Sequence, residues 1–176
     1  MKSNIALIGF MGVGKSAIGP ALAKRLGKKL VNTDLLISAR SGKSIPQIFW
    51  ENGESGFRKL ETEMVGEVSG GADQVIDCGG GVVLNPDNVN KLKQSSIIVW
   101  LVASPEVILQ RTARDGGGRP VLQGKSTLED IRRLLQLRKP YYEKAADMII
   151  DTSNSNVESL VDLIIARLTK NADYNS

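Results

Sequence analysis

The segment with the clearest chemical implication is GFMGVGKS, residues 9–16, which directly follows an apolar run at Asn4–Ile8. A glycine, four residues and then Gly-Lys-Ser is the spacing of a phosphate-binding loop between a strand and a helix. Glycines let the backbone N–H groups turn inward, the helix N-terminus adds partial positive charge, and the lysine reaches the outer phosphates. We therefore expect ATP to be bound by Gly12, Val13, Gly14, Lys15, Ser16 and Ala17.

Magnesium is the expected companion of these phosphates, and the hydroxyl of Ser16 is suited to bind it. The ion also needs oxygen ligands, often carboxylates, reached directly or through water. Asp77 ends one expected strand, where an acidic residue is typical of this class of fold. Asn32, which is neutral, and Asp34 end another. The chain has no histidine, so proton transfer has to use carboxylates.

Three consecutive glycines indicate where a phosphoryl acceptor binds. Gly79, Gly80 and Gly81 come after the strand that Asp77 ends, and ligands of open parallel sheets bind at the carboxyl ends of the strands. A backbone without side chains can approach a ligand closely. A tight turn is the simpler explanation, but three glycines are more than a turn requires.

Two arginines are candidates for binding an anionic acceptor. Arg58 lies beside the apolar stripe of an expected helix, and Glu61, three residues later, could hold its guanidinium in position. An exposed salt bridge explains Arg58 equally well. Arg138 extends an apolar helical row by one step, so its charge should point toward the interior or a cleft and require an anion there.

The elements that position these residues alternate along the chain. Apolar runs predict strands at Asn4–Ile8, Lys29–Asn32, Gln74–Asp77, 97–102 and Met148–Asp151. Capping and periodicity signals predict helices after Gly14, over 54–69, from Pro86, from Pro105, from Thr127 and over 157–168. Alternation of this kind requires crossover connections, so we expect an α/β fold: a five-stranded, mostly parallel sheet with helices on both faces, in one domain spanning 1–176.

One segment lacks any periodicity. Residues 115–126, DGGGRPVLQGKS, contain four glycines and a proline. A glycine-hinged loop beside a nucleotide site is a candidate lid, which we place at about 112–125, and a plain surface loop is the alternative.

The composition favours some classes of binding partner and some cellular locations over others. The net charge of +4 is spread along the chain and only 5% of the residues are aromatic, so small anions are favoured over nucleic acid. The longest late apolar run, 97–103, is too short to cross a membrane. The single cysteine, Cys78, cannot form an intramolecular disulfide and is expected to be packed, which favours a cytoplasmic protein. We also expect a monomer, with Trp50 and Trp100 in the core.

Taken together, these segments resemble the shikimate kinases, a family of P-loop small-molecule kinases. The resemblance extends over nearly the whole chain, through GFMGVGKS, NTDLLI, GFRKLE, CGGGVVL, the Arg119-Pro120 pair and LRKPYYE. It implies a fold like that of the nucleoside monophosphate kinases and transfer of the γ-phosphoryl group of ATP, with Mg²⁺, to the 3-hydroxyl of shikimate, a step toward aromatic amino acids.

The resemblance also implies roles for individual residues. Asp34 would hold the acceptor hydroxyl and take its proton, while Lys15 and Arg119 would stabilise the transferred group. Residues at about 33–61 would bind shikimate, and the groups that contact it would be Asp34, Arg58, Gly79, Gly80, Gly81 and Arg138. Arg111, Arg119 and Asn154 would complete the ATP site.

Two positions depart from the family pattern. An aspartate that helps to hold magnesium is usual where this chain has Asn32, and a small residue is usual where it has Asp77. Our hypothesis is that Asp77 supplies the missing charge to the metal, with Ser16. One alternative is a relative that binds nucleotide but transfers phosphate poorly. Another is a kinase with a different acceptor, such as gluconate or a nucleoside monophosphate.

Overall fold

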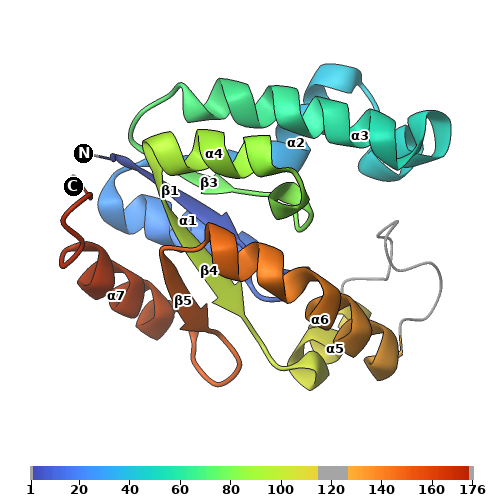
Figure 1. Ribbon diagram of the computed structural model, residues 1–176. Coiled ribbons are helices and arrows are strands. Elements are labelled where there is room, and N and C mark those ends of the chain that lie inside the picture. Colours follow the sequence, from blue (N-terminus) through green and yellow to red (C-terminus); the bar gives the residue numbers. More distant parts are fainter. Residues whose placement is uncertain (1, 115–126, 175–176) are drawn as a thin grey trace.

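A single parallel β-sheet organises the protein (Figure 1). The computed structural model describes residues 2–114 and 127–174. Within these ranges the sheet has five strands in the order β2-β3-β1-β4-β5, and every neighbouring pair is parallel. The strands are β1 (Asn4–Ile8), β2 (Lys29–Asn32), β3 (Gln74–Asp77), β4 (Ser96–Val102) and β5 (Met148–Asp151). The predicted α/β class and strand positions are therefore confirmed.

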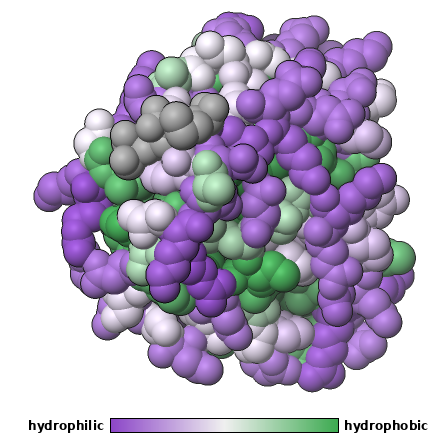
Figure 2. All heavy atoms as spheres, turned by 60° about the vertical axis from the view of Figure 1, so that its left-hand side comes forward, coloured by the Kyte–Doolittle hydropathy of each residue, from purple (hydrophilic) through white to green (hydrophobic). Residues whose placement is uncertain are grey.

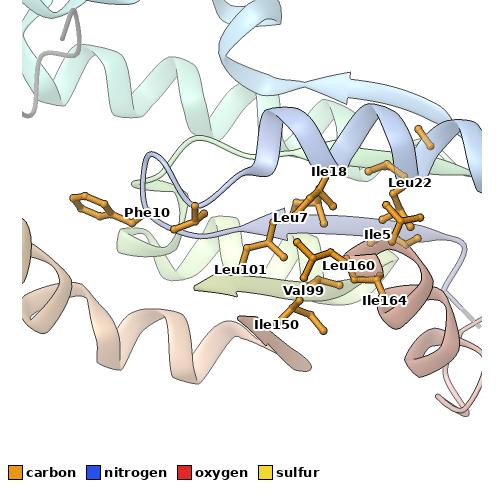
Figure 3. Packing of buried hydrophobic residues seen from close by; sticks show 14 of the residues in the cluster. Ile5, Leu7, Phe10, Ile18, Leu22, Val99, Leu101, Ile150, Leu160 and Ile164 are labelled. Carbon is orange, nitrogen blue, oxygen red and sulfur yellow. The ribbon is translucent and has the colours of Figure 1, made fainter. Parts of the chain in front are cut away.

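Helices cover both faces of the sheet (Figure 1). Successive residues of β1 point to opposite faces, so Ile5 and Leu7 enter one core and Ala6 and Ile8 enter the other. Figure 3 shows the first core, in which α1 and α7 contribute Ile18, Leu22, Leu160 and Ile164. The helices are α1 (Lys15–Leu26), α2 (Thr33–Ser41), α3 (Ile45–Ser69), α4 (Pro86–Ser95), α5 (Pro105–Arg114), α6 (Leu128–Ala145) and α7 (Val157–Leu168), with a short 3₁₀ turn at Val82–Leu84.

The region between β2 and β3 differs most from the prediction. The sequence analysis assigned no helix to Thr33–Ser41, yet α2 begins there, capped by the Asn32 side chain, which accepts a hydrogen bond from the Leu35 amide. Helix α3 begins at Ile45 because Ser44 forms a capping box, nine residues before the predicted start at 54. Gly53, at φ 67°, interrupts its helical geometry.

The two tryptophans differ in burial. Trp50 was expected in the core, and that was wrong: 88% of its surface is exposed on α3, whereas Trp100 is buried, as expected.

Only the start of the predicted lid can be located. Residues 112–114 form the end of α5, while the rest of the lid, including Arg119, falls outside the described residues.

The surface in Figure 2 is largely hydrophilic, and apolar side chains show mainly between polar ones. No helix in the described ranges is long and apolar enough to span a bilayer.

The two tryptophans provide a test of the core. Replacing Trp50 by alanine should change the free energy of unfolding by less than about 0.5 kcal/mol, because almost no contact is lost. Trp100→Ala should cost about 3–5 kcal/mol, because it opens a cavity beside Tyr142, on which Trp100 stacks. Urea unfolding followed by circular dichroism measures both, and equal losses would contradict the assignment of Trp100 alone to the core.

Candidate functional site

The predicted phosphate loop lies between β1 and the N-terminus of α1, the position that anion binding requires. Three of its glycines, Gly9, Gly12 and Gly14, have positive φ angles of 145°, 76° and 101°. At Gly9 the backbone also passes so close to the Leu101 carbonyl that a Cβ atom would overlap it. The glycines therefore shape the loop as well as leaving its backbone accessible.

Lys15 is the first residue of α1, and only 8% of its surface is exposed. Its side chain turns back over the loop, where Nζ donates hydrogen bonds to the carbonyls of Gly9 at 2.7 Å and Phe10 at 3.0 Å. The ammonium charge is therefore held at the loop itself, in the place where outer phosphates of a bound nucleotide would lie.

Three polar side chains meet at the carboxyl ends of β2 and β3. Asn32 and Asp77 are direct neighbours in the β2·β3 register, and Asn32 Nδ2 donates to Asp77 Oδ2 at 2.9 Å. Ser16 Oγ donates to the same oxygen at 3.5 Å. The Asn32 side-chain oxygen is already engaged, since it caps α2. The Asp77 carboxylate thus faces Ser16 of the phosphate loop, while the Asn32 amide contributes its N–H donor to that carboxylate.

Burial raises the pKa of the Asp77 carboxyl above its usual range. The positive charge of Lys15 opposes this rise, the nearby Asp34 charge adds to it, and the hydrogen bonds from Asn32 and Ser16 favour the ionised form. A cation bound beside Asp77 would likewise stabilise its negative charge.

Two acidic side chains converge on Gly79. A Cβ atom at this position would lie 2.8 Å from Asp34 Oδ1 and 3.0 Å from Glu61 Oε1, so only glycine leaves this space open. Asp34 comes from the first turn of α2 and Glu61 from α3. Burial raises the pKa of the Glu61 carboxyl, and the Arg58 charge opposes that rise. The site therefore brings the Asp34 carboxylate and the buried Glu61 carboxylate together beside Gly79.

The Arg58 side chain lies between two carboxylates of its own helix, α3, and the glycine segment, residues 79–81. Nη1 donates to Glu61 Oε2 at 2.7 Å, and Nη2 donates to Glu54 Oε1 at 3.2 Å. Because Glu61 is buried, the pair is more than the exposed salt bridge that was the alternative interpretation. The guanidinium lies over the Phe57 ring and occupies the space where Gly81 would carry a side chain.

Arg138 reaches the same glycine segment from α6. It is 8% exposed, as its place in the apolar helical row predicts, and Nη1 lies 3.5 Å from the Gly80 carbonyl oxygen. Its guanidinium lies 5.6 Å from the centre of the Phe10 ring in the phosphate loop. Arg58 and Arg138 therefore flank Gly80 and Gly81 from different helices.

The opposite end of the site is built around Arg111 of α5. Its guanidinium donates to the carbonyls of Gly12 and Thr152 at 3.2 and 2.8 Å and to the Thr152 hydroxyl at 3.1 Å. That hydroxyl donates to the Val13 carbonyl at 2.7 Å. Thr152, which the sequence analysis did not select, thus joins β5 and α5 to the phosphate loop. Its only sequence signal is its place directly after the strand predicted at Met148–Asp151.

One cleft of about 840 Å³ connects these groups. Among the described residues it is lined by the phosphate loop, Asn32, Asp34, Asp77, Gly79, Gly80 and Arg111. Arg58, Gly81, Arg138 and Asn154 are not part of this lining, although Ser155, next to Asn154, is. Arg138 contacts the lining at Gly80, and Arg58 is paired with Glu61, which lies beside the lining residue Gly79.

Tyr142 is a second residue that the sequence analysis did not select. Its hydroxyl donates to the Gly80 carbonyl at 2.5 Å, and its ring is buried against Trp100. The sequence signal that could have identified Tyr142 is its position one helical turn after Arg138.

Comparison with known proteins agrees with this geometry. A family model described as shikimate kinase matches residues 11–169. The shikimate kinase of Symbiobacterium thermophilum is 39% identical over 97% of this chain and 98% of the relative. That of Thermus thermophilus is 42% identical over 96% of this chain and 91% of the relative.

Solved structures are similar over the same length. The shikimate kinase of Acinetobacter baumannii in complex with shikimate has a TM-score of 0.92 and 36% identity, covering 98% of this chain and 96% of that one. The enzyme of Aquifex aeolicus has a TM-score of 0.82 and 36% identity, covering 97% and 98%. With its phosphate loop, its acidic strand ends and its paired arginines, the chain belongs to the shikimate kinase family.

Proposed function

We propose that this chain transfers the γ-phosphoryl group of ATP to the 3-hydroxyl group of shikimate. The observation that carries the proposal is a cleft that joins the phosphate loop to Asp34, Gly79 and Gly80. The shikimate complex of the Acinetobacter baumannii relative supports the same acceptor.

The acceptor end is suited to a small hydroxylated carboxylic acid. Arg58 and Arg138 provide planar donors for a carboxylate, and the backbone of Gly79, Gly80 and Gly81 allows close approach. Glu61 fixes Arg58 in a buried pair, so the guanidinium is ordered before the acceptor arrives.

The proposed reaction forms one bond to the γ-phosphorus and breaks another. The acceptor oxygen forms a bond to the γ-phosphorus as the bond from that phosphorus to the β,γ-bridging oxygen of ATP breaks, and Asp34 receives the hydroxyl proton. Lys15, at the phosphate loop, stabilises negative charge on the transferred group and on ADP. Arg119, in the part of the proposed lid that lies outside the described residues, would assist, and Arg111 and Asn154 would lie near the nucleotide base.

The donor set at the strand ends fits a magnesium ion. Ser16 offers a hydroxyl and Asp77 a buried carboxylate, while the oxygen of Asn32 is occupied by the cap of α2. We therefore propose that Ser16 and Asp77 hold the ion, with Asn32 orienting Asp77 through its amide group. When bound, magnesium neutralises charge on the β- and γ-phosphates.

We further propose a cytoplasmic monomer, from the charge distribution and the single buried cysteine.

Acceptor identity can be measured directly. ADP release from Mg-ATP should rise on addition of shikimate and should not rise with gluconate or AMP. Arg138→Ala should raise the KM for shikimate about 100-fold, because a buried charge-assisted contact is lost. Arg132→Ala, on the exposed side of α6 and paired with Glu106, is the control and should leave this KM within about twofold of wild type.

Other outcomes would redirect the assignment. Faster ADP release with gluconate or AMP than with shikimate would keep the kinase and discard the acceptor. Failure of every acceptor to stimulate ADP release would instead indicate a nucleotide-binding relative.

The metal carboxylate can be tested independently of turnover. Binding of Mn²⁺ to the ADP complex, followed by electron paramagnetic resonance, should weaken about 10–100-fold in Asp77→Asn. Asp73→Asn, at the exposed opposite end of β3, should bind the ion as the wild type does. The exchange variant carrying Asp77→Asn and Asn32→Asp keeps one carboxylate at this strand end and should regain part of the affinity. Unchanged Mn²⁺ binding in Asp77→Asn would exclude Asp77 as a ligand.

A further inference from the structure

Tyr142 makes a contact with the acceptor segment that the proposed chemistry does not yet use. It is 1% exposed, and its hydroxyl donates to the Gly80 carbonyl at 2.5 Å. Its ring stacks on Trp100 of β4, with centroids 5.4 Å apart and planes inclined by 14°. The phenol is therefore fixed by the sheet before it meets Gly80.

The Gly80 carbonyl belongs to the same rigid unit as the Gly81 N–H. The peptide bond is planar and, as throughout the described ranges, trans, so the carbonyl and the N–H point in opposite directions. Glycine on both sides of this unit imposes little conformational restraint. A hydrogen bond that fixes the Gly80 oxygen therefore also fixes the direction of the Gly81 N–H, which belongs to the backbone proposed to contact shikimate.

Arg138 contacts the same oxygen from one helical turn earlier on α6. Its Nη1 atom lies 3.5 Å from the Gly80 carbonyl, which is a much weaker contact than that of Tyr142. The phenol is thus the main donor to this oxygen, and the Gly80 carbonyl does not depend on Arg138 for a hydrogen-bond partner.

The phenol remains a donor under all ordinary conditions. Burial raises the pKa of Tyr142 to about 12, although the Arg138 charge opposes the rise. Charges from Arg58 and Glu61 on α3 also act on it, in opposite directions. The hydroxyl proton is thus present throughout the neutral pH range.

We propose that Tyr142 is a positioning residue for the acceptor: its hydroxyl fixes the Gly80-Gly81 peptide beside Arg138, the arginine proposed to bind the shikimate carboxylate. This inference rests on the proposed function, and it assigns Tyr142 no contact with the reacting atoms.

The neighbouring tyrosine provides a matched control. Tyr142→Phe removes only the hydroxyl and keeps the ring that stacks on Trp100, whereas Tyr141→Phe makes the same chemical change on a side chain that is 48% exposed. Calorimetric titration of each protein with shikimate, and separately with ADP, measures the two ends of the cleft. Shikimate affinity should fall about tenfold in Tyr142→Phe, about the effect of one lost buried hydrogen bond. ADP affinity, and both affinities of Tyr141→Phe, should stay within about twofold of wild type.

A purely structural role would give a different pattern. Equal losses of shikimate affinity, ADP affinity and melting temperature in Tyr142→Phe would overturn the positioning role, as would unchanged shikimate affinity. Should Tyr142→Phe fail to fold, wild-type protein labelled with ¹⁵N-glycine decides the question. Saturating shikimate should shift the Gly81 amide resonance, and an unmoved resonance would refute the inference. Failure of the wild type to bind shikimate at all would be a separate result, against the proposed function itself.

Discussion

The compensation of the buried Asp77 charge is the interaction on which the rest of the site depends. A charge in this position is costly unless it is compensated, and its partners come from separate elements: Asn32 from β2, and Ser16 and Lys15 from the start of α1. The parallel sheet makes this convergence possible, because all strands end at the same edge. Asn32 also caps α2, so one side chain orients both Asp77 and the helix that carries Asp34.

At the acceptor end, missing side chains are as important as those present. Asp34 and Glu61 occupy the space beside Gly79, and the Arg58 guanidinium occupies the space beside Gly81. A Cβ atom at either glycine would collide with the polar groups proposed to bind the acceptor. The glycine segment is thus complementary to its charged neighbours, and its flexibility is offset by the contacts of Tyr142 and Arg138 with Gly80.

The sequence was most informative where a local pattern reports burial or backbone shape. Each predicted strand lies within one residue of its observed bounds. The central strands β1, β3 and β4 are buried and read as short apolar runs, whereas the edge strands β2 and β5 are partly exposed. Helix α2 has no such pattern: Leu35 and Leu36 are not buried, so no apolar stripe marks it. The prediction that Trp50 lies in the core was wrong because the apolar character of a residue does not show which side of a helix faces solvent.

Contacts between distant segments were beyond the reach of the sequence. Thr152 joins β5 to the phosphate loop, 139 residues away along the chain, and no local spacing encodes that hydrogen bond. The link from Tyr142 to Gly80 spans 62 residues. The residues proposed for shikimate and metal came from motif spacing and family resemblance. The structure adds which atoms are already engaged, as the Asn32 oxygen is.

The two ends of the site share one short stretch of chain, and this limits how they can move. Asp77, proposed for the metal, and Gly81, proposed for the acceptor, are separated by only three residues at the end of β3. Gly79 is tied to Thr33 of α2, and Gly80 is tied to α6 through Tyr142. The distance between the metal and acceptor groups along this stretch is therefore set by the sheet and two helices. Asp34, next to Thr33 on α2, belongs to this fixed arrangement, and so does Arg58, whose guanidinium occupies the space beside Gly81. The groups proposed for the metal and for the acceptor are therefore held in one framework at the end of β3.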